Sequence, residues 1–134
     1  MDSSPPIIIV EDEMELASLY KTYLNAAGFN AISFVDPLLA FEYYTKNTRN
    51  IQLVITDLRM PTMSGIELAC KIRKINKNVV IFLITAFMIE DLINSSKEYM
   101  EAQIDRILEK PMKLGLLKQH ISEHLSMSNA SQNS

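Results

Sequence analysis

Short apolar segments alternate with amphipathic segments five times along the chain. Residues 7–10, 51–56 and 79–84 are nearly continuous runs of aliphatic and β-branched residues, which is typical of strands buried on both faces. Residues 29–35 are a more mixed run, and residues 105–108 give the weakest of the five signals. The pattern predicts five short strands, most of them inside the protein.

The segments between these strands repeat their apolar residues at helical spacing. Gly28 is a stop signal after the first of them, and Asp36 followed by Pro37 predicts an N-cap and a first helical turn. Ser64 and Glu67 have the spacing of an S-x-x-E capping box. We therefore expect helices at residues 13–27, 37–46, 64–75, 88–100 and 112–125.

This strict alternation predicts an α/β fold in which helices cover both faces of a parallel sheet. Right-handed crossovers place the carboxyl ends of all strands on one edge of the sheet. Ligands of open α/β sheets bind beyond that edge, so the residues that follow each strand are the candidates for chemistry.

Composition narrows the class of protein further. The chain has 134 residues, of which 48% are hydrophobic and 22% charged, as expected for one globular domain. A net charge of -3 argues against general binding to nucleic acid or to a membrane surface. One cysteine, no signal peptide and no apolar run of about 18 residues lead us to expect a cytoplasmic protein. We expect a short polar segment at 1–6, the domain at 7–125 and a disordered Ser/Asn-rich tail at 126–134.

Charged and polar residues follow four of the predicted strands. Glu11 and Asp12 follow the first strand, Asp57 the third, Thr85 the fourth and Lys110 the fifth. Three carboxylates held close together repel one another, and Mg²⁺ relieves such repulsion with oxygen ligands. A carboxylate can also act as the nucleophile of phosphoryl transfer, with a lysine and a hydroxyl stabilising the phosphoryl oxygens. Each residue alone could be structural, but their joint placement predicts a phosphoacceptor site with Asp57 as nucleophile.

Four motifs carry a resemblance to a known family. They are VEDE at 10–13, ITDLRMPTMSGIEL at 55–68, TA at 85–86 and KP at 110–111. Over residues 7–125 the chain resembles the receiver domain of two-component response regulators. The resemblance implies a flavodoxin-like (βα)5 three-layer sandwich, with a parallel five-stranded sheet in the order 2-1-3-4-5.

The resemblance also implies roles for individual residues. Asp57 accepts a phosphoryl group from the phosphohistidine of a sensor histidine kinase or phosphotransfer protein. Mg²⁺ binds to Asp12 and Asp57 directly, to Glu11 through water, and to the backbone carbonyl of Arg59.

On phosphorylation, Lys110 reaches the phosphoryl oxygens and Thr85 swings towards them. The Lys110–Pro111 peptide bond resembles one that is cis in the family.

The same resemblance implies how the signal leaves the domain. The face made by the fourth helix, the fifth strand and the last helix is expected to bind a downstream protein, without direct contact to nucleic acid or membrane. We expect a monomer or a phosphorylation-dependent dimer, and no enzyme beyond its own phosphorylation and dephosphorylation. Two positions depart from the family pattern. Ile107 stands where an aromatic switch residue is usual, and Gln103-Ile104 replaces a usual Gly-Ala.

Several alternatives bear on this interpretation. The departures leave open a pseudo-receiver, an interaction module that works without phosphorylation. A flavin- or nucleotide-binding module is disfavoured because residues 11–13 are all acidic and repel phosphate. A hydrolase with an aspartyl nucleophile is disfavoured because Arg59 stands where a second acid is needed. His120 and His124 are four residues apart and could bind a metal, but no third ligand is evident in the sequence.

Overall fold

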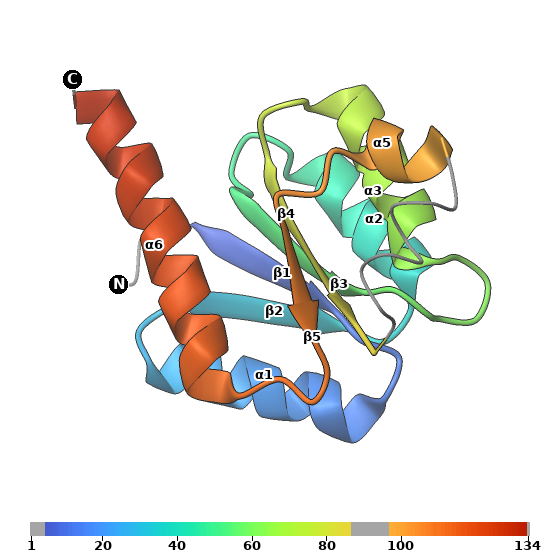
Figure 1. Ribbon diagram of the computed structural model, residues 1–134, viewed down its shortest axis with the longest axis horizontal. Helices are drawn as coiled ribbons and strands as arrows, with labels where there is room; N and C mark the ends of the chain where they lie inside the picture. The colour runs from blue at the N-terminus through green and yellow to red at the C-terminus, as the bar shows by residue number, and fades with distance from the viewer. Residues whose placement is uncertain (1–4, 87–96, 134) are drawn as a thin grey trace.

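The computed structural model describes residues 5–86 and 97–133 and shows strands and helices in alternation (Figure 1). The strands are β1 (Pro6–Val10), β2 (Asn30–Phe34), β3 (Leu53–Asp57), β4 (Val80–Thr85) and β5 (Arg106–Glu109). The helices are α1 (Met14–Ala26), α2 (Pro37–Lys46), α3 (Gly65–Ile75), α5 (Lys97–Ala102) and α6 (Leu114–Asn133). All five predicted strands are present, each within two residues of its expected limits.

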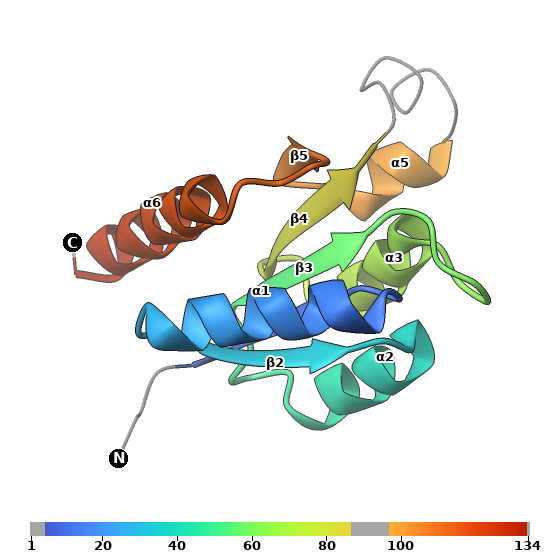
Figure 2. The same cartoon turned by 90° about the horizontal axis from the view of Figure 1, so that it is seen from below.

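The five strands form one parallel sheet in the order β2-β1-β3-β4-β5 (Figure 2). The central strand β3 is buried along its whole length, as its largely apolar sequence predicts. The predicted strand order is confirmed. All five strands therefore end at the same edge, where the candidate residues lie.

Side chains of successive strand residues point to opposite faces and build two cores. Ile7 and Ile9 contribute to the core under α1 and α6, whereas Ile8 and Val10 contribute to the core under α2, α3 and α5. Figure 1 shows the same division, with α1 and α6 on one side of the sheet and the other three helices opposite. The protein is thus the three-layer sandwich that the sequence predicts.

The predicted helix ends are set by the expected local interactions. Asp36 Oδ1 accepts a hydrogen bond from the amide of Leu38 at 2.9 Å, and Ser64 Oγ accepts one from the amide of Glu67 at 3.1 Å. Gly28 follows the end of α1 with a positive φ of 99°, a conformation that glycine adopts readily. These caps fix where α2 and α3 begin, and α3 in turn begins beside the candidate site.

Two helices differ from the ranges that the sequence predicts. Helix α6 continues to Asn133, whereas the sequence led us to expect that this helix ends at residue 125. No glycine or proline stands between residues 126 and 133, so nothing in the local sequence ends the helix at residue 125. Most of the helix expected at 88–100 lies outside the described residues, and its final part corresponds to α5. Among the described helices, none is long and apolar enough to cross a membrane.

The opposite, amino edge of the sheet holds a buried arginine. The Arg73 side chain is only 7% exposed, and it forms an ion pair of 3.0 Å with Asp105, which also accepts the amide of Ile81 at 2.8 Å. Gln103, just before β5, has a positive φ of 49° and presents its carbonyl to the same guanidinium. The guanidinium donates in all to the carbonyls of Lys77, Val79, Ala102 and Gln103 and to the Asp105 carboxylate. Arg73 therefore joins α3, the end of α5 and the starts of β4 and β5.

Candidate functional site

The carboxyl edge of the sheet bears a cavity of about 290 Å³. Its lining comes from the loops after β1, β3, β4 and β5, which are far apart in the sequence. Asp12, Glu13, Asp57, Arg59, Thr85, Ala86 and Lys110 line it. The strand ends predicted to share a site thus do share one cavity.

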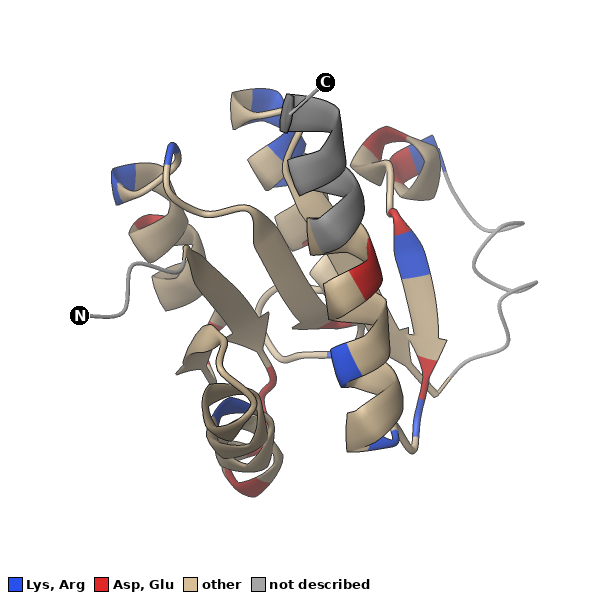
Figure 3. Cartoon of the chain, turned by 90° about the vertical axis from the view of Figure 1, so that its left-hand side faces the viewer, with Lys and Arg blue, Asp and Glu red and all other residues tan. Residues whose placement is uncertain are grey.

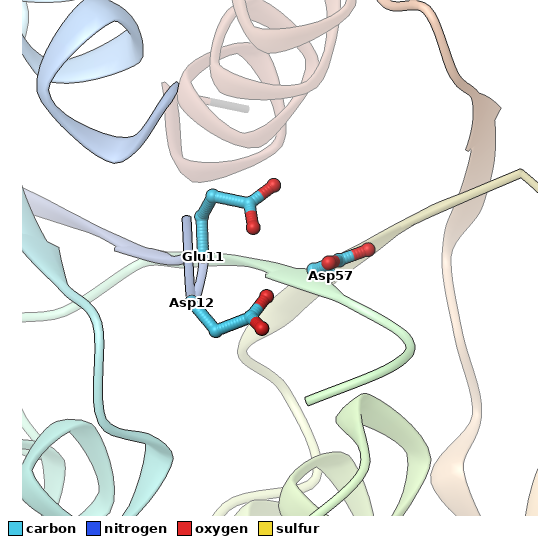
Figure 4. A group of neighbouring side chains, drawn as sticks. All are labelled: Glu11, Asp12 and Asp57. Atoms are coloured by element: carbon cyan, nitrogen blue, oxygen red, sulfur yellow. The ribbon is translucent and has the colours of Figure 1, made fainter. Parts of the chain in front are cut away.

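Three carboxylates meet at this edge (Figure 4). Oxygens of Glu11, Asp12 and Asp57 all lie within 4.8 Å of one another. The Glu11 and Asp57 residues are buried, with only 1% and 8% of their surfaces exposed. Such proximity of partly dehydrated anions is unfavourable unless a cation lies between them.

Lys110 supplies part of the compensating charge. Its ammonium lies 2.9 Å from Glu11 Oε1 and 3.1 Å from Asp57 Oδ2. Burial lowers the pKa of Lys110, but its hydrogen bonds to the two carboxylates outweigh this effect and hold that pKa above its ordinary value. Burial raises the pKa of Glu11 and of Asp57, and Lys110 offsets only part of the rise. The positive charge of Lys110 therefore compensates the two buried carboxylates only in part.

Backbone groups orient two of the carboxylates. Asp57 Oδ1 accepts the amide of Leu58 at 2.9 Å, and Glu11 Oε2 accepts the amide of Glu13 at 3.1 Å. The Thr56 hydroxyl donates to the carbonyl of Asp57 at 2.9 Å. These bonds hold both side chains at the strand ends without the help of a ligand.

Gly65 is a site residue that the sequence analysis did not single out. A Cβ atom at this position would lie 2.2 Å from the backbone oxygen of Asp57 and 3.0 Å from Leu83 Cδ1. The amide of Gly65 donates to the carbonyl of Leu58 at 2.8 Å, which draws the start of α3 against the end of β3. The glycine in the motif SGIEL was the available signal, since a glycine that opens a helix beside a functional strand end can mark a close backbone approach.

The remaining predicted site residues lie within the strands, or directly after them, as the sequence indicates. Thr85 ends β4, is 1% exposed, and its carbonyl accepts the amide of Lys110 at 2.9 Å. Arg59 lines the cavity, while Ile107 lies in the middle of β5 and packs partly buried against the core on the α3 and α5 side. The Lys110–Pro111 peptide bond is cis, as the resemblance implied.

The donor set fits a magnesium ion. Mg²⁺ prefers oxygen ligands, is usually bound by one or two carboxylates, and keeps several of its waters. Asp12 and Asp57 offer carboxylate oxygens within reach of each other, and the cavity leaves room for water. The pKa values of Glu11 and Asp57 stay raised beside Lys110, which is consistent with a further cation at this cluster.

Comparison with known proteins places the chain in a family. Residues 7–122 match the family model described as the response regulator receiver domain. The chain is 30% identical over 92 residues to sporulation initiation phosphotransferase F of Bacillus subtilis, covering 69% of this chain and 73% of the relative. It is 32% identical over 119 residues to a cyclic di-GMP phosphodiesterase of Thermotoga maritima, covering 89% of this chain but only 30% of that protein.

The structure agrees with this assignment. It superposes on CheY of Borrelia burgdorferi, from a crystal structure of its complex with CheX, BeF3 and Mg²⁺, with a TM-score of 0.79 and 25% identity. The match covers 90% of this chain and 88% of that one. The chain belongs to the response regulator receiver domain family of two-component signalling and has its flavodoxin-like fold.

Proposed function

We propose that this receiver domain is a phosphorylation switch in which Asp57 takes a phosphoryl group from a phosphohistidine. The partner is a sensor histidine kinase or a phosphotransfer protein. The single observation that carries the proposal is the buried Asp57 carboxylate, held between a backbone amide and Lys110 at the mouth of an acidic cavity.

The step balances as a simple displacement. An Asp57 carboxylate oxygen attacks the phosphorus, the P–N bond breaks, and its electron pair stays on the imidazole nitrogen, which takes up a proton from solvent. The product is an acyl phosphate on Asp57 and a free histidine on the donor. Burial supports the attack, because it removes water from the carboxylate and makes it more basic, as the raised pKa of Asp57 reflects.

The other site residues stabilise charge on the transferred group. Asp12 and Asp57, with Glu11 through water and the carbonyl of Arg59, would hold Mg²⁺, whose charge neutralises phosphoryl oxygens. Lys110, already 3.1 Å from Asp57, is placed to contact another of those oxygens. The Thr85 hydroxyl, at the end of the neighbouring strand, provides a third contact. The domain catalyses only its own phosphorylation and dephosphorylation. Turnover of an external substrate would need a second acid two residues after Asp57, and that position is occupied by Arg59.

Phosphorylation then shifts the population of two conformations. The new charge draws Thr85 and Lys110 towards Asp57, and both lie beside β5. We infer that a downstream protein distinguishes the two states at one face of the domain. This face is made by the expected fourth helix, whose described part is α5, together with β5 and α6. Ile107, in the middle of β5, would respond by repacking in place of an aromatic rotation.

Intact mass measurement after incubation with acetyl phosphate and Mg²⁺ tests the proposal. We expect one added phosphate on the wild type, none on Asp57→Asn and none in EDTA. If acetyl phosphate and a phosphohistidine donor both leave the wild type unmodified, the phosphorylation-independent interaction module becomes the better interpretation.

A further inference from the structure

A second cluster of titratable residues joins β5 to α6, away from the acidic cavity. In Figure 3 the charged residues of β5 gather at its two ends, next to α6, while its centre is uncharged. At the amino end Arg106 directs its guanidinium towards α6. Its Nε donates to His124 Nε2 at 2.8 Å, and its Nη1 donates to His120 Nδ1 and to Glu123 Oε2, the latter at 2.9 Å.

These bonds determine which nitrogen of each neutral imidazole carries the hydrogen. A guanidinium only donates, so each contacted ring nitrogen must carry a free lone pair. His120 must then hold its proton on Nε2 and His124 on Nδ1, which are opposite tautomers. An imidazolium has no lone pair, so protonation of either ring removes one of the bonds to Arg106 and replaces it with repulsion.

Packing prevents the rings from avoiding this conflict. His124 packs edge-on against the fully buried Phe82 of β4, with ring centroids 5.1 Å apart, and His120 packs against the same ring at 6.5 Å. Arg106, 28% exposed, is freer to move than rings held against a buried aromatic residue. Arg106 is therefore the partner that can move away if a ring gains a proton.

The charged groups around the rings do not remove the conflict. Burial, followed by Arg106, lowers the pKa of His124 from its ordinary value of 6.5, and Asp105 and Glu123 oppose this only in part. Glu123 is itself engaged by Arg106 and by Gln119. The neutral imidazole of His124 is thus the form that the folded protein favours.

Arg106 and His120 also line a groove of about 510 Å³ that runs along β5 and the start of α6. Its other walls are Ile107, Leu108, Glu109, Pro111, Met112, Lys113 and Leu116. A change at the Arg106 contacts therefore changes the shape and charge of this groove.

We propose that His120, His124 and Arg106 form a proton-sensitive contact between α6 and β5, here called the clasp. The clasp is closed at neutral pH, when Arg106 donates to both rings, and it opens in acid, when these bonds break. The protons taken up add positive charge to the groove. The clasp is independent of phosphoryl transfer at Asp57 and does not rest on the proposed function. It makes the β5–α6 surface responsive to pH as well as to any signal that arrives at the acidic cavity.

Nuclear magnetic resonance of the imidazole nitrogens in the full chain tests the clasp directly. We expect the Nε2–H tautomer for His120 and the Nδ1–H tautomer for His124 at pH 8, with the midpoint of His124 below 6.5. In Arg106→Met the midpoint of His124 should rise and both tautomer preferences should weaken. Lys118→Met, which removes an exposed charge from the same helix, should leave them unchanged. Identical spectra and midpoints in wild type and Arg106→Met would overturn the proposal.

Thermal unfolding of a double variant gives a second, independent measurement. His120→Gln with His124→Gln keeps an acceptor oxygen at each position but cannot gain a proton. The lowered pKa of His124 gives stability that is present above pH 6.5 and lost as the pH falls through the folded value. The melting temperature of the wild type should therefore fall more steeply from pH 8 to pH 5 than that of the variant. Equal slopes would count against the clasp, and a variant that does not fold leaves the Arg106→Met spectra as the deciding result.

Discussion

The two edges of the sheet differ in how fully their buried charges are compensated by neighbouring groups. At the amino edge one arginine, Arg73, meets four carbonyls and one carboxylate, so all its donors have acceptors. At the carboxyl edge three carboxylates lie within 4.8 Å of one another, and the Lys110 ammonium forms ion pairs with two of them, Glu11 and Asp57. The donors of Arg73 are thus all satisfied, whereas Lys110 compensates the two buried carboxylates of the carboxyl edge only in part.

This difference separates a structural cluster from a functional one. A buried ion whose hydrogen bonds are all satisfied holds elements together and has no capacity left for a ligand. A cluster with excess charge costs stability, and such a cost is typical of a site that binds an ion or carries out a reaction. The comparison predicts that changes at the amino edge lower stability, while changes at the carboxyl edge alter binding and chemistry.

The largest effect on stability is expected at the amino edge. Arg73→Met removes the donors of a nearly buried cluster and leaves the carbonyls and Asp105 without their partner. We expect a loss of about 3–5 kcal/mol in the free energy of unfolding, measured by urea denaturation. Lys74→Met, at the exposed neighbouring position, should change it by less than about 0.5 kcal/mol. A loss of that small size in Arg73→Met would show that the two edges do not differ as argued.

Magnesium should stabilise the protein through the carboxyl edge alone. At a concentration 100 times its dissociation constant, Mg²⁺ should raise the free energy of unfolding by about 2.7 kcal/mol, because it binds only the folded site. The same increment is expected in Arg73→Lys, since the two edges are independent, and none in Asp12→Asn. Denaturation with Mg²⁺ or with EDTA measures these differences. An equal increment in Asp12→Asn would place the ion elsewhere.

Gly65→Ala should damage the carboxyl edge by steric means. The new methyl group would meet the Asp57 carbonyl at 2.2 Å, so the start of α3 or the end of β3 must move. We expect a loss of about 1–3 kcal/mol and slower phosphorylation of Asp57. Gly115→Ala is the matched control, because its Cβ has no neighbour within 4 Å and alanine favours a helix. It should gain up to about 1 kcal/mol and phosphorylate at the wild-type rate.

The sequence predicted the carboxyl edge far better than the amino edge, and the reason is topological. In a parallel sheet the residue after each strand must lie at one edge, so Asp57, Thr85 and Lys110 could be placed together without coordinates. The two ion pairs of Lys110 depend on side-chain reach, which spacing does not give.

Arg73 could not be placed by the same reasoning. It stands in an amphipathic helix where an arginine usually faces water, and its acceptors come from segments that only the folded chain brings near. Helix α6 also runs beyond the limit expected at residue 125, because no residue that stops a helix follows there.

The smallest and most diagnostic effect concerns Asp57 in the absence of metal. Burial raises the pKa of Asp57 above its ordinary value of 3.8, so the folded protein holds this proton more tightly than the unfolded chain does. The contribution of the group to stability is therefore greatest below pH 3.8 and is lost as the pH rises through the folded value. Asp57→Asn, in EDTA, should raise the free energy of unfolding at pH 7, by on the order of 1 kcal/mol because the bond to Lys110 is lost as well.

The pH dependence distinguishes this effect from ordinary surface charge. The advantage of Asp57→Asn should shrink as the pH falls through the raised pKa of the wild-type carboxyl, which then takes up its proton. Glu42→Gln removes an exposed carboxylate paired with Lys46 and should change stability by less than about 1 kcal/mol. Urea denaturation at several pH values measures all three proteins. An advantage that grows in acid would mean that Asp57 stabilises the apo fold, and the carboxyl edge would then be as complete as the amino edge.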